Sequence, residues 1–513
     1  MQAKNKDVPF SSKEMRALEV NAEYFGISPL QLMENAGCGV AHEIISRFSK
    51  DKKIAVFCGL GGNGGDGFVA ARHLLSLGYS STIILVGKDC NIKNESALQN
   101  WLILRALQDR VILLEAADSA EIPTVTADVA IDALLGTGTK GQLKAPIFQV
   151  VELINSLNAF KLAVDVPTGI DSDTGEVQGT AVKADLTLTF HAAKTGFKKA
   201  KKYLGKLVVK DIGLPKEIEQ FAGPGDVFLA KKPRTPTSHK GDFGRLLVIG
   251  GNEVYYGAPT LVSLGAQRTG VDLVYLAAPI KAADAISAMS PDLITVKLEG
   301  SNLNTGNIKM LKPYLTMVDA VAMGPGLGLN PETIDFVKLC VEEVEKAAKP
   351  LLLDADGLKA FARFKRPLKV PLVLTPHAGE YAILTGESLP ENQNDRVKSV
   401  QKTAKKLDAV ILVKGKVDVI CSSEKCKLNF TGNQGMTVGG TGDVLSGIIG
   451  GLMAQKVDPF EASVAGAFVN GAAGDFVASE IGFHMVATDI IDWIPQILDD
   501  PMSHLKVRRS SGK

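Results

Sequence analysis

The sequence lacks the features that mark nucleic-acid-binding, membrane and zinc proteins. Its 57 basic and 56 acidic residues leave a formal net charge of +1, so there is no basic excess for a nucleic-acid or membrane surface. No apolar run reaches membrane-spanning length without a charge, and the polar N-terminus has no h-region, so we expect no signal peptide. The seven histidines form no HxxxH or Cys/His cluster, which argues against a zinc site. We therefore expect no nucleic-acid partner and no membrane association.

Cysteine is also scarce, and its six positions are scattered through mostly apolar runs: Cys38, Cys58, Cys90, Cys340, Cys421 and Cys426. We interpret them as reduced, buried thiols, which favours a cytoplasmic protein. The alternative is that Cys421 and Cys426 pair across a hairpin or take part in metal binding.

The length of 513 residues exceeds what one ordinary core holds, so we expect two or three domains. A hydrophobic content of 45% and a charged content of 22% are typical of a globular protein. A stretch rich in proline and glycine near residues 217–240 predicts a linker. We divide the chain into domains at 1–222 and 223–505, followed by a disordered tail at 506–513.

In the first half, predicted strands alternate with helical stretches, and polar or glycine-rich turns follow the strands. This order is typical of an open, mostly parallel α/β sheet that binds ligands beyond the carboxyl ends of its strands. The turn GLGGNGGDG at residues 59–67 can place backbone amides around a phosphate, or it can be a plain tight turn without a ligand. Three such turns are expected to converge on one crevice, and their polar residues are Asn63, Asp66, Asp132, Asp165 and Thr168.

The second half repeats the strand–helix rhythm without repeating a motif, so we predict no internal duplication. Its most informative stretch is NQGMTVGGTGDVLSG at residues 433–447. The glycines allow a tight turn that exposes amides at the start of a helix, where an anion binds well. Asp443 then stands beside this turn as a general base for a hydroxyl that meets a phosphoryl group. The alternative is an ordinary glycine-rich loop with Asp443 as the helix N-cap.

Other turns of the second half supply groups that complement this stretch. The glycines at 324–328 offer further amides, and Lys414 can neutralise phosphate charge. His377 and Glu380 can contact a substrate or a hydrated magnesium ion. Taken singly, His377 can be a structural histidine and Lys414 a surface charge, but together at consecutive strand ends they predict phosphoryl transfer.

Along nearly its whole length, the chain resembles the bifunctional NAD(P)H-hydrate repair enzymes. The first half carries LMENAG, CGLGGNGGDG, DALLGTG and DVPTG in the order of an NAD(P)H-hydrate epimerase domain. The second half carries SHKGDFG, GGNEVYYGAP, GPGLG, DADGL, LTPHAGE, LVKG and GMTVGGTGDVLSG, as in an ADP-dependent hydrate dehydratase domain. The resemblance implies an N-terminal Rossmann-like three-layer αβα domain followed by a C-terminal ribokinase-like α/β domain.

The resemblance also implies two reactions on hydrated nicotinamide cofactors. The first domain interconverts the R and S forms of NADHX or NADPHX at C6 of the ring. The second phosphorylates the C6 hydroxyl of the S form; phosphate then leaves, and NAD(P)H and AMP result. The implied cofactors are K⁺ in the first domain and Mg²⁺ in the second, with ADP, or alternatively ATP, as phosphoryl donor. These small molecules are the expected partners, together with further copies of the chain in a homo-oligomer.

The functional positions of the family carry over to this sequence one by one. The potassium ligands match Asn63, Asp132 and Thr168. The hydrate-binding positions of the first domain match Gly62, Asn63, Gly64, Gly65, Asp66, Gly136, Thr137, Gly138, Thr139, Lys140, Gly141, Gln142 and Asp165. Hydrate contacts in the second domain match Ala258, Gly326, His377 and Asp443. Nucleotide contacts match Lys414, Gly415, Lys416, Val417, Asp418, Gly439, Gly440, Thr441 and Gly442. Asp165 is assigned proton transfer in epimerisation, and Asp443 keeps its role as base.

Three positions depart from the family pattern, and we expect none of them to abolish activity. Gly62 replaces the first of two asparagines, Thr168 replaces a serine, and Asp292 replaces a glutamate. Two other functions are kept as alternatives. One is a ribokinase-like kinase acting on a vitamin precursor. The other has the first half as a non-catalytic nucleotide-binding or partner-binding module.

Overall fold

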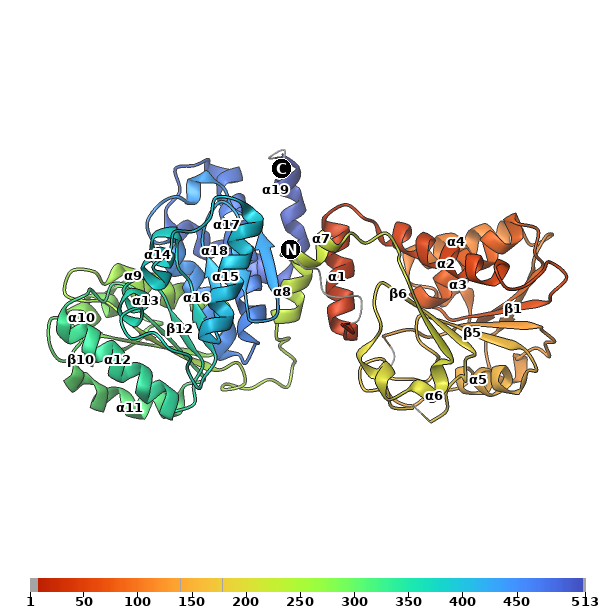
Figure 1. Cartoon of the computed structure of the whole chain (residues 1–513), viewed down its shortest axis with the longest axis horizontal. Helices are drawn as coiled ribbons and strands as arrows, with labels where there is room; N and C mark the ends of the chain where they lie inside the picture. The colour runs from red at the N-terminus through yellow and green to blue at the C-terminus, as the bar shows by residue number, and fades with distance from the viewer. Residues whose placement is uncertain (1–7, 139, 178, 511–513) are drawn as a thin grey trace. The chain divides into compact units, whose positions relative to one another are not determined.

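The computed structural model describes residues 8–138, 140–177 and 179–510 (Figure 1). The chain forms two compact units, of which one ends at Ile218 and the other begins at Glu219. This division lies close to the expected boundary between residues 222 and 223. In the described part of the chain, no helix is long and apolar enough to cross a membrane.

The first unit is built on a parallel sheet with the strand order β3-β2-β1-β4-β5-β6-β7. Its strands are β1 (Ile54–Cys58), β2 (Ser81–Val86), β3 (Ile112–Ala116), β4 (Val129–Ala133), β5 (Phe160–Val164), β6 (Leu186–Phe190) and β7 (Lys206–Lys210). Every residue of β1 and β4 is buried, as expected for parallel strands covered on both faces.

Helices cover both faces of this sheet (Figure 1). They are α1 (Ser12–Tyr24), α2 (Pro29–Ile45), α3 (Gly62–Ser76), α4 (Glu95–Ala106), α5 (Ile147–Ser156) and α6 (Lys201–Leu204), and α7 (Lys216–Gln220) spans the division between the units. Val56 of β1 shares one core cluster with residues of α2, α3 and α4. Its neighbour Phe57 shares another cluster with residues of α5. The expected three-layer αβα arrangement is therefore confirmed.

The second unit contains a sheet with the strand order β10-β9-β8-β11-β12-β13-β14-β15-β16. Its strands are β8 (Arg245–Ile249), β9 (Leu273–Pro279), β10 (Ile294–Leu298), β11 (Ala320–Met323), β12 (Leu351–Leu353), β13 (Leu372–Leu374), β14 (Val410–Val413), β15 (Asp418–Cys421) and β16 (Cys426–Asn429). The strands from β10 to β14 pair in parallel, whereas β14, β15 and β16 pair antiparallel. A hairpin therefore closes one edge of an otherwise parallel sheet.

The helices of the second unit are α8 (Pro224–Ala230), α9 (Gly257–Gln267), α10 (Ile280–Met289), α11 (Ile308–Met317), α12 (Pro331–Lys346), α13 (Ala355–Phe361), α14 (Ala378–Thr385), α15 (Gln393–Leu407), α16 (Thr441–Ala454), α17 (Pro459–Ile481), α18 (Ala487–Asp499) and α19 (Leu505–Ser510). From Val444 onward α16 is buried at every residue, which confirms it as a core helix. The α/β class and an α/β second domain are thus as expected.

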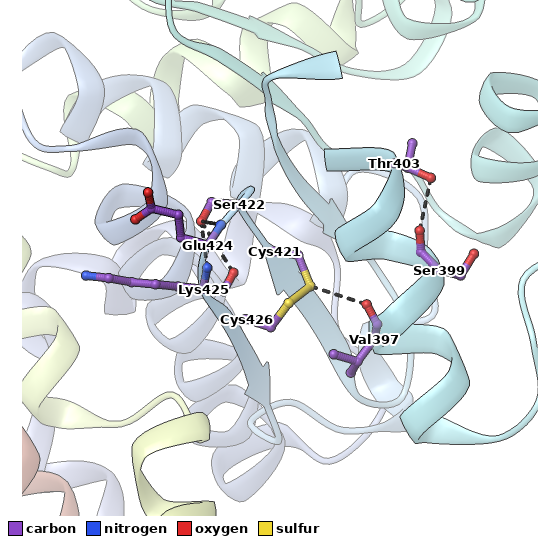
Figure 2. Close-up of a disulfide and its surroundings, with 8 residues drawn as sticks. All are labelled: Val397, Ser399, Thr403, Cys421, Ser422, Glu424, Lys425 and Cys426. Carbon is purple, nitrogen blue, oxygen red and sulfur yellow. Dashed lines mark hydrogen bonds between the residues drawn. A yellow bond between two sulfur atoms is a disulfide. The ribbon is translucent and has the colours of Figure 1, made fainter. Parts of the chain in front are cut away.

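Two expectations about the second unit need correction. Helix α19 extends to Ser510, so most of the tail expected to be disordered from residue 506 is helical, and residues 511–513 lie outside the described part. Cys421 and Cys426 stand opposite each other in the β15–β16 hairpin and form a disulfide (Figure 2). The short turn sets the register that brings the two thiols together. The cysteines are therefore not all reduced, and Cys90 is exposed rather than buried.

Candidate active sites

Close backbone packing explains the glycines in the turn between β1 and α3. A methyl group at Gly59 would lie 2.0 Å from the carbonyl oxygen of Leu134, and one at Gly64 would lie 1.9 Å from that of Gly59. Helix α3 begins at Gly62 without a side-chain cap. Its first amides and the positive end of its dipole are therefore available to an anion.

The three expected potassium ligands are brought to the carboxyl ends of β1, β4 and β5. The Thr168 hydroxyl and amide donate to the two carboxylate oxygens of Asp132, over 2.7 and 2.8 Å. Asn63 lies beside Gly136, where a methyl group would be 3.5 Å from the Asn63 Cβ, and its buried amide nitrogen has no hydrogen-bond partner. Burial raises the pKa of Asp132 to about 6, and among the described residues no cation offsets this burial. A buried carboxylate without a counter-ion, beside an asparagine, fits a monovalent cation.

Asp165 follows β5 with a backbone φ of 63°, a left-handed conformation that is uncommon for residues other than glycine. Its carboxylate accepts a hydrogen bond from the Thr189 hydroxyl over 2.9 Å and pairs with the Lys194 ammonium at 2.8 Å. Burial, with a further contribution from the Asp165 charge, raises the pKa of Asp66 well above its ordinary value. A carboxyl group that favours its protonated form therefore lies within electrostatic range of Asp165, where proton transfer is expected.

The remaining predicted residues of the first site lie in the loop after β4. Gly136 contacts Asn63, and the Thr137 carbonyl accepts a hydrogen bond from the Ser172 hydroxyl over 3.3 Å. Gly138, Lys140, Gly141 and Gln142 are exposed farther along this loop. Thr139 lies outside the described residues.

In the second unit, α16 begins at the glycine-rich turn with an open N-terminus. Gly440 is its N-cap, with a φ of 97° and no side-chain cap. Asp443 is the third residue of the helix and is not its N-cap, which removes that alternative. A methyl group at Gly447 would lie 2.1 Å from the Val262 carbonyl oxygen, and one at Gly440 2.6 Å from the Leu261 side chain. Helices α9 and α16 run side by side in the same direction. The predicted hydrate contacts Ala258 and Asp443, near the start of each helix, therefore lie at the same end of the two helices.

Lys414 joins the predicted nucleotide site to a buried acid. Its ammonium donates to Asp354 Oδ1 over 2.9 Å and lies 3.2 Å from where a methyl group on Gly442 would be. The Ser446 hydroxyl donates to Asp354 Oδ2 over 2.7 Å. Burial lowers the pKa of Lys414, but the charge of Asp354, the hydrogen bond to it and the charges of Glu380 and Asp443 together outweigh burial, so the net pKa is raised. Lys414 is thus a fixed cation at the start of α16 and not a surface charge.

The same surroundings tune Asp443 for proton transfer near neutral pH. Burial, followed by the charge of Asp354, raises the pKa of Asp443 to about 7, although Lys414 opposes the change. A base whose pKa lies near the working pH is both available and strong enough to accept a proton.

His377 has a structural role as well as a position in the site. Its Nδ1 accepts from the Gly379 amide over 3.0 Å, and the Glu380 carboxylate accepts from the His377 amide over 3.1 Å. These contacts form a capping box at the start of α14. His377 also bridges to Lys414 through the backbone, and its side chain is 59% exposed. The ring is therefore fixed in place at the edge of the site, where a ligand can reach it.

The other predicted contacts of the second site are arranged around these residues. Gly326 has a φ of 70°, and a methyl group there would lie 2.4 Å from the Tyr255 carbonyl oxygen, close to the start of α9. Asp418 closes the turn at 415–418, because its carboxylate accepts from the Gly415 amide and the Asn429 side chain, each over 3.0 Å. Burial raises its pKa to about 6. Lys416 is exposed on this turn and Val417 is partly buried.

Comparison with known proteins identifies both halves of the chain. The family model described as YjeF-related protein N-terminus matches residues 29–196, and the one described as NAD(P)H-hydrate dehydratase matches residues 246–496. A bifunctional NAD(P)H-hydrate repair enzyme from Pyrobaculum aerophilum is 43% identical over 495 residues, which cover 95% of this chain and 97% of that protein. This chain belongs to the bifunctional NAD(P)H-hydrate repair enzymes. The family expected from the motifs is confirmed.

A second full-length relative agrees with this family. A bifunctional NAD(P)H-hydrate repair enzyme from Hyperthermus butylicus is 42% identical and covers 96% of this chain and 92% of its own length. A solved ADP/ATP-dependent NAD(P)H-hydrate dehydratase from Bacillus subtilis is 28% identical, with a TM-score of 0.48, and covers 55% of this chain and 98% of its own. The full-length relatives do not favour the vitamin-precursor kinase or a non-catalytic first half.

Two buried charged residues that contact predicted site residues do not follow from the sequence motifs. Asp354 is 1% exposed and lies directly after β12, at the start of the family motif DADGL. Lys194 is also 1% exposed and lies in no motif. A strand-end acid was a usable signal for Asp354, whereas nothing local distinguishes Lys194 from a surface lysine.

Proposed function

We propose that this repair enzyme epimerises NADHX and NADPHX in its first domain and dehydrates the S forms in its second. The observation that carries the proposal is the arrangement of Asp443, Lys414 and Gly442 at the open N-terminus of α16. It combines a base of pKa about 7, a fixed ammonium and free backbone amides. Such a group suits phosphoryl transfer to a hydroxyl.

In the dehydratase reaction, Asp443 takes the proton of the C6 hydroxyl as its oxygen attacks the terminal phosphate of ADP. Lys414 and the amides at residues 439–442 hold the phosphate oxygens, and the bond to the leaving AMP breaks. The C6–O bond of the phosphorylated hydrate then breaks, with electrons supplied by the ring nitrogen, and phosphate leaves. Loss of a proton from C5 restores the C5=C6 double bond of NADH. Ala258, Gly326 and His377 are proposed to line the hydrate side of this site.

Mg²⁺ is proposed to enter with the nucleotide. Among the described residues, no group of three or more His, Cys, Asp or Glu side chains is arranged to hold a metal ion. Magnesium commonly keeps its waters and binds through substrate phosphates. Its chemistry here would be to neutralise charge on the transferred phosphoryl group.

In the epimerase reaction, Asp165 is proposed to move the proton at the C6 hydroxyl. The glycine turn at 62–66 and the loop at 136–142 are proposed to bind the hydrate. Asn63, Asp132 and Thr168 would hold K⁺, whose charge would offset that of Asp132 and attract substrate oxygens. The buried Asp132 carboxylate without a cation and the unpartnered Asn63 amide support this site.

The dehydratase assignment is tested with pure (S)-NADHX, Mg²⁺ and either ADP or ATP. We expect NADH to form together with one equivalent each of phosphate and AMP when ADP is the donor. ADP is the donor we expect to be preferred. A stable phosphorylated product without NADH would instead support a small-molecule kinase.

We also propose a homo-oligomer in the cytoplasm. Helix α4 exposes Leu102 by 51% and Ile103 by 38%, and the edge strand β3 exposes Ile112 by 59%. Exposed apolar patches of this kind often mark protein contacts. Light scattering should give a mass above that of one chain, and Leu102→Glu should lower it. Because two cysteines form a disulfide, the argument for the cytoplasm from reduced cysteines no longer holds, and the proposed location rests on the substrates. Cell fractionation tests it.

A further inference from the structure

We propose that Lys194 is a positioning residue of the epimerase site, which supplies the counter-ion of the Asp165 carboxylate and fixes one of its oxygens. The inference rests on the role proposed above for Asp165. Lys194 lies in the segment HAAKTG after β6, outside every motif used for the family.

The contacts to Asp165 converge on a single oxygen. The Lys194 ammonium lies 2.8 Å from Oδ1. The Thr189 hydroxyl donates to Oδ1 over 2.9 Å, and the Phe190 amide donates to it over 3.4 Å. Within the described residues, none of these contacts involves Oδ2, and the Asp165 side chain is 14% exposed. One oxygen is therefore fixed by the protein, and the other is available to a substrate.

The Lys194 side chain is held in place, and its ammonium group is fully engaged in contacts. Its ammonium also donates to Thr189 Oγ1 over 3.0 Å and to the carbonyl oxygens of Phe190 and Ala192 over 3.1 and 3.2 Å. The backbone around it pairs with Phe10, whose amide donates to the Ala193 carbonyl over 2.9 Å. A buried ammonium is costly without a counter-ion, and Asp165 is the carboxylate in contact with it. A lysine on the surface would not be buried, and its ammonium would not have three hydrogen bonds and an ion pair within the protein.

The charges around Asp165 explain why it needs a cation. Asp66 at the start of α3 and Glu19 on α1 are carboxyl groups that interact with it, and Arg16 lies 3.6 Å from Glu19. Partial desolvation, with a contribution from Asp165, raises the pKa of Glu19. Neighbouring negative charge and burial favour the protonated form of a carboxyl group. Lys194 places the opposite charge in direct contact with the Asp165 carboxylate.

The test uses Lys194→Met in the full-length enzyme. Epimerisation of (R)-NADHX is followed by chromatography without nucleotide, across a range of pH. We expect the acid limb of the rate profile to move to higher pH by about one unit or more. Dehydration of (S)-NADHX by the second domain should be unchanged, and a thermal unfolding transition like that of the wild type shows that the first domain is folded. Lys198→Met, at an exposed lysine of the same loop, is the matched control.

The outcomes separate this inference from the proposed function. A wild-type enzyme without epimerase activity contradicts the function, whereas an active wild type with an unmoved profile in Lys194→Met contradicts the role of Lys194. If Lys194→Met does not fold, Glu19→Gln decides the matter. Removing that negative charge should move the acid limb to lower pH, and an unmoved limb overturns the electrostatic control of Asp165 proposed here.

Discussion

At the scale of single residues, surroundings rather than residue type determine the chemistry of this protein. Asp443 at the start of α16 and Asp165 after β5 both lie beside a lysine. Burial and the charge of Asp354 raise the pKa of Asp443 to about 7, whereas Asp165 pairs directly with the Lys194 ammonium. Two acids in different environments are thereby suited to different proton transfers.

Asp443→Asn tests the base directly. Dehydration should fall by about 10²- to 10⁴-fold, because general-base catalysis commonly contributes that much. In the wild type, the rate should rise with pH and level off above about 7, since the ionised form is active. Retention of dehydration by the variant would show that another group takes the proton.

The same substitution that lowers activity should raise the stability of the folded protein at high pH. The folded-state pKa of Asp443 is raised above its ordinary value of 3.8, so the folded protein favours the protonated form. Stability from this group is present at low pH and is lost as pH rises toward about 7. Asp443→Asn should therefore have a higher Tm than the wild type at pH 8, with the difference vanishing near pH 4. Equal melting temperatures at both pH values would contradict the raised pKa.

Asp354→Asn tests the residue that sequence reasoning missed. Its charge raises the pKa of Asp443, whereas Lys414 lowers it. Removing the charge of Asp354 should therefore move the acid limb of the dehydration profile to lower pH. The epimerase reaction of the same protein is the control and should be unaffected. A limb that stays in place would mean that Asp354 does not influence the base.

At the scale of elements, the packing of α9 against α16 fixes where the two helix N-termini lie. Gly447→Ala would place a methyl group 2.1 Å from the Val262 carbonyl oxygen. We expect a loss of stability of about 1–3 kcal/mol or more from overpacking. Gly450→Ala is the control in the same helix, because its methyl group would meet the Leu246 side chain at 3.3 Å. Denaturant unfolding should therefore show a clearly smaller loss for Gly450→Ala than for Gly447→Ala.

The same elements show what local sequence can predict. Glycine spacing and apolar content in the sequence predict helix α16 and the turn before it, and the structure confirms both. Local patterns leave element ends uncertain, so bounds such as Phe160–Val164 for β5 come from the structure. Helix α19 was missed because its few polar residues resemble a disordered tail.

At the scale of the whole molecule, the division into two α/β units was predictable, but the contacts between distant strand ends were not. The strand order of each sheet, the Lys194–Asp165 pair and the Lys414–Asp354 pair depend on tertiary pairing, which no local pattern encodes. The family motifs supplied most of the predicted site residues. Of those residues, the structure shows the three expected potassium ligands at neighbouring strand ends, and it shows Lys414 beside Gly442.

The most direct test of the account is recovery of absorbance at 340 nm from an equal mixture of (R)- and (S)-NADHX. The full-length enzyme is supplied with ADP, Mg²⁺ and K⁺. We predict complete conversion to NADH, at a rate for the R half that exceeds uncatalysed epimerisation. Recovery that stops after the S half would contradict a catalytic first domain, and no recovery with ADP or ATP would contradict the repair function itself.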